Sequence, residues 1–80
     1  MEPLLDVMTV KAETGYRLLL EFENGEWRRF ELTPFLTRKP FDRLAVESLF
    51  LQAMVEEGTV VWPGGLDIAP ETLYLRSVPI

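Results

Sequence analysis

The chain has 80 residues, with eight Lys or Arg against thirteen Asp or Glu and a net charge of −5. This length accommodates one domain, so we expect residues 1–80 to form a single domain. The acidic balance argues against direct nucleic-acid binding, because such binding depends on Lys and Arg to neutralise phosphates. Hydrophobic residues make up 48% of the chain, which is typical of a folded protein rather than a disordered one.

The chain contains neither cysteine nor histidine. This composition excludes disulfides and cysteine nucleophiles, and it removes the most common general base and transition-metal ligands. The serines, Ser48 and Ser77, therefore have no histidine to activate them. Carboxylates such as Asp67 and Glu71 could act as an acid–base pair, but the dense oxygen ligands of a calcium loop are missing. We expect no catalytic residue, cofactor or metal, and no enzymatic activity.

The sequence also argues against a membrane location. Its apolar runs, such as Val60–Trp62, fall far short of the roughly 20 residues that a membrane span requires. No basic start followed by an apolar stretch marks a secretory signal. Because the lack of cysteine suits a reducing compartment, we expect a cytoplasmic protein.

Alternation of apolar and polar residues predicts three strands at the start of the chain, over residues 5–12, 16–23 and 26–32. A turn at residues 13–15 joins the first two strands. The dipeptide Asn24-Gly25 is a strong hairpin signal between the second and the third.

The register of this hairpin follows from its core face. A two-residue loop would place Glu31 opposite Leu18, which puts a charge on the apolar side. A three-residue loop at residues 23–25 instead pairs Leu18 with Phe30 and Leu20 with Arg28. Because a slip of one residue moves every side chain to the other face, the apolar match favours the longer loop.

The longer loop places Trp27 and Arg29 on the second face of the sheet, beside Leu19. Tryptophan and arginine are the residues that most often anchor protein interfaces, so this face is a candidate partner surface. The alternative is that residues 51–54 or the C-terminal helix cover it. A second candidate contact for an acidic partner is the basic pair Arg38-Lys39, which otherwise forms a solvated loop.

The helices predicted after the third strand are short. Thr33 is a candidate N-cap for one turn at residues 34–37. The broken helical spacing over residues 41–50 predicts one or two further turns. A last helical turn is expected at residues 70–74, with Asp67 as a candidate cap.

Two further strands are predicted at residues 51–56 and 59–62, joined by a turn at Glu57-Gly58. Either residues 59–61 or residues 5–10 are expected to lie at a sheet edge, where a partner could add a strand. The whole pattern predicts an α+β fold, a small antiparallel meander with hairpins and short helices packed on one side.

Several segments together give the chain a resemblance to a known family. They are Phe22–Glu26, Glu31-Leu32, Leu44, Phe50, Gly58–Pro63 and Gly65–Tyr74. In this order they resemble the bacterial domain-of-unknown-function 2442 family, and the most specific parts are Trp-Pro-x-Gly-x-Asp followed by Pro-Glu-x-Leu-Tyr. One departure is Glu31, where the family commonly has aspartate. The motif residues that we expect to be structural are Asn24, Gly25, Trp62, Pro63, Gly65, Asp67, Pro70, Leu73 and Tyr74. We also expect the Trp62 ring to pack over Leu66 or Leu73.

The resemblance implies a bacterial cytoplasmic domain with no established activity, often encoded beside another small protein and in some relatives fused to a helix-turn-helix domain. We therefore expect a protein-interaction module, antitoxin-like or regulatory, that binds a protein partner or forms a homodimer. The alternatives are a DNA-linked regulatory domain and a small-ligand binder that uses carboxylates.

Overall fold

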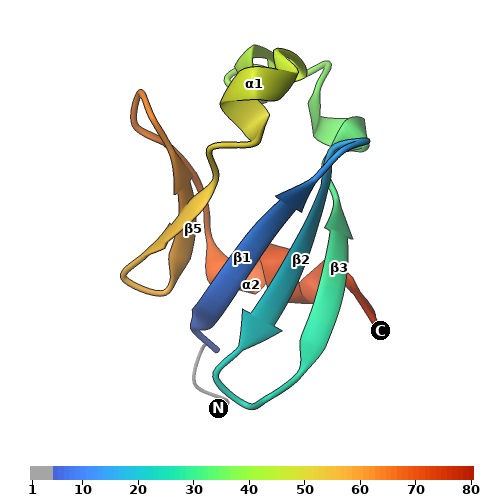
Figure 1. The fold of residues 1–80 in the computed structure, drawn as a ribbon, viewed down its shortest axis with the longest axis vertical. Helices are drawn as coiled ribbons and strands as arrows, with labels where there is room; N and C mark the ends of the chain where they lie inside the picture. The colour runs from blue at the N-terminus through green and yellow to red at the C-terminus, as the bar shows by residue number, and fades with distance from the viewer. Residues whose placement is uncertain (1–4) are drawn as a thin grey trace.

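Two antiparallel sheets form the framework of residues 5–80, the part of the chain that the computed structural model describes (Figure 1). The four-stranded sheet has the order β1-β2-β3-β7, and the three-stranded sheet has the order β4-β5-β6. The strands are β1 (Val7–Glu13), β2 (Arg17–Phe22), β3 (Trp27–Glu31), β4 (Met54–Glu56), β5 (Thr59–Trp62), β6 (Leu66–Ile68) and β7 (Val78–Pro79). The helices are the 3-10 helices η1 (Thr33–Phe35) and η2 (Phe41–Ala45) and the α-helices α1 (Glu47–Phe50) and α2 (Pro70–Leu75). This arrangement confirms the predicted α+β fold.

The β2–β3 hairpin has the predicted register. Leu18 pairs with Phe30 and Leu20 pairs with Arg28. The hairpin closes where the Phe22 N–H donates to the Glu26 carbonyl at 2.9 Å, so the loop spans residues 23–25. Gly25 takes a φ of +86°, the left-handed conformation that glycine adopts without steric cost.

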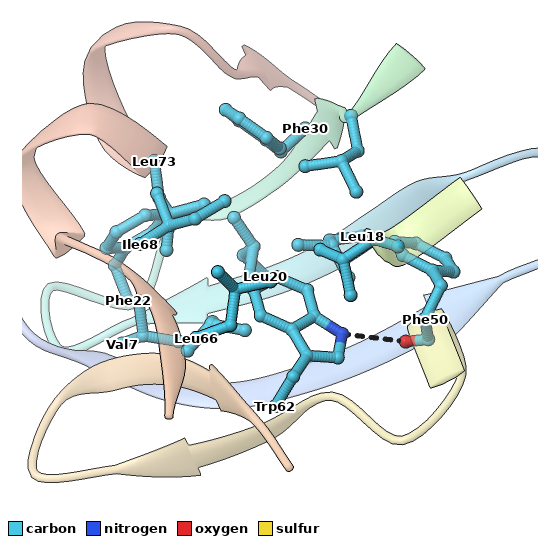
Figure 2. Packing of buried hydrophobic residues seen from close by; sticks show 13 residues of the cluster. Val7, Leu18, Leu20, Phe22, Phe30, Phe50, Trp62, Leu66, Ile68 and Leu73 are labelled. Atoms are coloured by element: carbon cyan, nitrogen blue, oxygen red, sulfur yellow. Dashed lines mark hydrogen bonds between the residues drawn. The ribbon is translucent and has the colours of Figure 1, made fainter. Parts of the chain in front are cut away.

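The core lies between the inner face of the four-stranded sheet, the three-stranded sheet and α2. Figure 1 shows α2 behind the plane of β1, β2 and β3. Both sheets and α2 contribute fully buried side chains to one cluster. Elements too short to be stable alone are therefore stabilised by packing against each other. The buried cluster comprises Val7, Leu18, Leu20, Phe22, Phe30, Leu32, Leu44, Phe50, Val60, Trp62, Leu66, Ile68 and Leu73 (Figure 2).

Trp62 ties the second half of the chain together. Its indole Nε1–H donates to the Phe50 carbonyl at 2.9 Å, the dashed line in Figure 2. The Trp62 and Phe50 rings stack, with centroids 6.4 Å apart and planes at 29°. Phe50 is an aromatic partner of Trp62 that was not predicted, because α1 carries Phe50 into the core beside the end of β5. Leu66, one of the two predicted neighbours, pairs with Trp62 across β5 and β6 and lies in the same buried cluster.

Both predicted helix caps are wrong. Leu32 precedes η1 as its cap, and Thr33 lies inside that helix, where its hydroxyl donates to the Glu31 carboxylate instead of a backbone N–H. Ala69 is the N-cap of α2 without a side-chain hydrogen bond, and Asp67 lies in β6. Pro70 opens α2 at a position whose N–H would have no helical partner, so this helix begins without a polar cap.

The predicted strands also need three corrections. β4 begins only at Met54, because residues 51–52 form a turn. β5 lies between β4 and β6, so residues 59–61 are central, whereas β1 is an edge strand as predicted for residues 5–10. The short strands β6 and β7 were not predicted.

Candidate protein-interaction surface

Within residues 5–80, no helix lies over the outer face of the four-stranded sheet, which Figure 1 shows toward the viewer. The cross-strand pairs place its residues in rows. Trp27 pairs with Glu21, and Arg29 pairs with Leu19, which in turn pairs with Lys11. These side chains point away from α2, because the alternate residues of β2 and β3 form the core.

Trp27 is the largest apolar side chain on this face and is 42% exposed. Val78 on β7 and Ile80 just after it add two more apolar side chains beside it. Val78 pairs with Arg29, and the Ile80 N–H donates to the Trp27 carbonyl at 3.1 Å. Val78 and Ile80 are 62% and 67% exposed. We call Leu19, Trp27, Val78 and Ile80 the Trp27 patch.

The sequence left open that residues 51–54 or the C-terminal helix cover the Trp27 patch, and neither segment lies on it. Residues 51–54 lead into β4 in the other sheet. α2 packs on the inner face, where its Leu73 is fully buried. The patch is therefore open to solvent in the part of the chain that the structure describes.

Arg29 is held in place beside the patch by an ion pair. Its Nε lies 3.0 Å from Glu13 Oε1, and both side chains are partly exposed. The hydrogen bond from Arg29 lowers the pKa of Glu13, and the charges of Arg29, Arg17 and Lys11 lower it further. The guanidinium is thus a positioned charge at the edge of an apolar patch.

The structure does not bring Arg38 and Lys39 to this patch. Both are exposed in the loop between η1 and η2. That loop lies at the top of the molecule in Figure 1, whereas Trp27 starts β3 at the opposite end of the sheet. Among the predicted contact residues, only Leu19, Trp27 and Arg29 come together.

A polar cluster on the inner face was not predicted. The Arg28 side chain is only 12% exposed and lies over the Tyr74 ring, 4.3 Å from its centroid. Its Nη1 donates to Glu26 at 2.9 Å, while Nε and Nη2 donate to the hydroxyl and carbonyl of Ser77 at 2.7 and 2.8 Å. The Tyr74 hydroxyl donates to Glu26 at 2.5 Å, and the Asn24 amide donates to the same oxygen at 2.8 Å.

These hydrogen bonds perturb the titration of the cluster. The Tyr74 hydroxyl, the Asn24 amide and the Arg28 guanidinium lower the pKa of Glu26. The same contact with Glu26, together with desolvation, raises the pKa of Tyr74. The cluster ties the β2–β3 turn to α2. The predicted register already places Arg28 opposite Leu20 on the core face. A buried charge needs hydrogen-bond partners, so this position was the sequence signal that could have predicted the cluster.

The other motif residues have structural positions. Trp62 and Leu73 are buried, and Pro70 is the first residue of α2. Gly65 has a φ of +82°, which fits its place in the turn between β5 and β6. Asp67 differs from these because it is exposed on β6.

A concave surface lies on the three-stranded sheet. It is a shallow depression of about 460 Å³. We call it the β5 groove, and it is lined by Met54, Glu56, Val61, Trp62, Pro63, Gly65, Leu66 and Asp67. Its carboxylates are Glu56 and Asp67, so the predicted pair of Asp67 and Glu71 does not come together there. Within residues 5–80, no group of three or more acidic side chains converges on a possible metal site.

The structure places the protein in a class: small α+β folds of two antiparallel sheets, here with one sheet face uncovered within residues 5–80. No helix in residues 5–80 has the length and apolar character to cross a membrane. The family model described as "Protein of unknown function (DUF2442)" matches residues 7–79, and the chain belongs to this family. No curated protein and no solved structure matches the chain.

Proposed function

We propose that the protein is a protein-interaction module rather than an enzyme, and that it binds its partner through the Trp27 patch. In this proposal it acts in the bacterial cytoplasm as an antitoxin-like or regulatory partner of a neighbouring small protein. The observation that supports it best is the exposed Trp27, on a sheet face that no other element covers in the described part of the chain. Exposed tryptophan beside other apolar side chains is characteristic of interfaces.

The exposed area of Trp27 is large enough to matter for binding. Covering 42% of a tryptophan side chain removes roughly 100 Å² from water, worth about 2.5 kcal/mol before the costs of association. Val78 and Ile80 extend the apolar area on the adjacent strand. The patch thus has a central aromatic anchor with apolar neighbours, the arrangement that binding hot spots share.

The charge of the chain favours a partner that is basic or that carries charges of both signs. The chain carries a net charge of −5, which attracts a basic protein and repels a nucleic-acid backbone. The outer sheet face itself carries both signs, since Lys11 and Arg29 alternate with Glu13 and Glu21. A face with both signs is also compatible with a second copy of the chain, so a homodimer is the alternative occupant of the same patch.

A tagged pull-down from cells that naturally produce the protein tests the proposal. The test variant is the double substitution Trp27→Ala/Arg29→Ala. The matched control is Leu51→Ala/Arg43→Ala, which removes one exposed apolar and one exposed basic side chain outside the patch and outside the other predicted contact, Arg38-Lys39. We expect the parent and the control to recover one stoichiometric protein that the test variant loses. Equal recovery by all three proteins would contradict the proposal, and a self-associated parent would identify the homodimer.

A further inference from the structure

We propose that the β5 groove binds an extended peptide segment in which an apolar side chain is flanked, two residues away on each side, by Lys or Arg. This site is on the other sheet from the Trp27 patch. The inference stands independently of the proposed function, because different residues carry it.

The apolar floor of the groove is the pair Met54 and Val61, in a cross-strand row that continues to the charged Asp67 on β6. Met54 pairs with Val61, and Val61 pairs with Asp67. Their neighbours Val60 and Ile68 point into the core, so this row points outward. Met54 is 52% exposed, and an apolar side chain seated on Met54 and Val61 would remove that surface from water.

One end of the groove is rigid. Trp62 and Leu66 pair across β5 and β6 and are almost fully buried, although both also line the groove. The hydrogen bond from Trp62 to the Phe50 carbonyl fixes the indole. Figure 2 shows Trp62 enclosed by core side chains on its inner side. The groove is therefore preformed, which lowers the cost of binding.

Two carboxylates flank this floor from opposite sides. Glu56 is on β4 and Asp67 is on β6, with β5 between them. Glu56 pairs with Thr59 and Asp67 with Val61, so they are offset by two residues along β5. Strand spacing and rise place them roughly 12 Å apart. Both are exposed, and within residues 5–80 neither forms an ion pair.

The distance between Glu56 and Asp67 matches the spacing of side chains in an extended peptide. Side chains at positions i−2 and i+2 of a strand point to the same side and lie about 13 Å apart. Cations there reach both carboxylates while the side chain at position i rests on the apolar floor. A single metal ion cannot bridge carboxylates at this distance, because its ligand bonds are only about 2.0–2.6 Å long.

The charge of the molecule disfavours a second copy as the occupant. Two chains of charge −5 repel each other, and most strongly at an acidic groove. Residues 39–43 of the chain do have the required composition, with Phe41 between Lys39 and Arg43. However, residues 41–45 form η2, so this segment is not extended.

Nuclear magnetic resonance titration of the ¹⁵N-labelled protein tests the inference. The probe is the capped peptide Ser-Lys-Ser-Leu-Ser-Lys-Ser, and the isomer Ser-Ser-Lys-Leu-Lys-Ser-Ser places both cations on the opposite side. We expect saturable shifts of the Met54, Val61 and Asp67 amides with the probe, and clearly weaker binding of the isomer. Glu56→Gln/Asp67→Asn should weaken probe binding about three- to tenfold. The control variant Glu21→Gln/Glu31→Gln removes two carboxylates from the other sheet and should bind like the parent.

Any of four results of the peptide titrations would overturn the inference. These are the absence of saturable binding, equal binding of the two peptides, equal weakening by the control variant, and probe shifts centred on the Trp27 patch. If the groove amides instead shift with protein concentration alone, the occupant is a second copy and the inference is also wrong. The comparison of the two peptides uses the unmodified protein, so it does not depend on how the variants fold.

Discussion

Replacing Trp62 with phenylalanine tests how the second half of the chain is held to the core. The substitution keeps an aromatic ring that can stack on Phe50 but removes the Nε1–H donor and part of the buried ring. Because Trp62 is only 2% exposed, neither loss can be compensated by water. We therefore expect Trp62→Phe to destabilise the protein without changing its fold.

The magnitude follows from the two losses. The Phe50 carbonyl also accepts the Ala53 N–H at 3.2 Å, so it keeps one partner, and the lost hydrogen bond costs about 0.5–1.5 kcal/mol. Complete truncation of a buried tryptophan to alanine costs about 3–5 kcal/mol, and the partial loss of ring here about 1–2 kcal/mol. The free energy of unfolding should fall by about 2–3 kcal/mol, which lowers the Tm of a domain this size by roughly 10–20 °C.

Urea unfolding followed by circular dichroism measures this change, and Trp27→Phe is the matched control. It makes the same chemical change at a side chain that is 42% exposed. We expect the control to change the free energy of unfolding by less than about 0.5 kcal/mol. The reasoning is refuted if Trp62→Phe is as stable as the parent, or if both variants lose equal stability.

Two further predictions concern pH and the turns. Because hydrogen bonds from Tyr74 and its neighbours lower the pKa of Glu26 below its ordinary 4.5 in the folded state, the parent should be more stable than Glu26→Gln above that pH. This advantage should disappear as the pH falls through the lowered pKa; an advantage that persists in acid would contradict the assignment. In thermal unfolding, Gly25→Ala should cost about 1–2 kcal/mol, because it strains a left-handed turn with open space around it. Gly58→Ala should cost more, since its Cβ would lie 2.5 Å from Asp6 Cγ, and equal costs would show that Asp6 moves away freely.

The β2–β3 hairpin was predictable because two independent signals agree. Its alternating apolar residues identify the inner face, and Asn24-Gly25 gives the loop. Only one register satisfies both, and it also places Trp27 on the outer face. The location of the candidate patch therefore followed from local sequence, although its exposure depended on where α2 packs.

The remaining features depend on contacts between distant segments. β6 has three residues with the charged Asp67 in the middle, so its pattern is too short to identify a strand. The hydrogen bonds between Arg28 and Ser77 join residues 49 positions apart, and no spacing rule predicts them. The β5 groove likewise requires three strands to pair before Glu56 and Asp67 lie on its two sides.

The central claim is that the Trp27 patch binds a protein partner. The most direct test is calorimetric titration of the purified partner from the pull-down against the parent, Trp27→Ala and the control Leu51→Ala. We predict that Trp27→Ala raises Kd about thirtyfold or more, as expected for a hot-spot tryptophan worth at least 2 kcal/mol, while Leu51→Ala leaves Kd within about twofold. If Trp27→Ala and Leu51→Ala bind the partner as tightly as the parent does, the patch is not the binding surface.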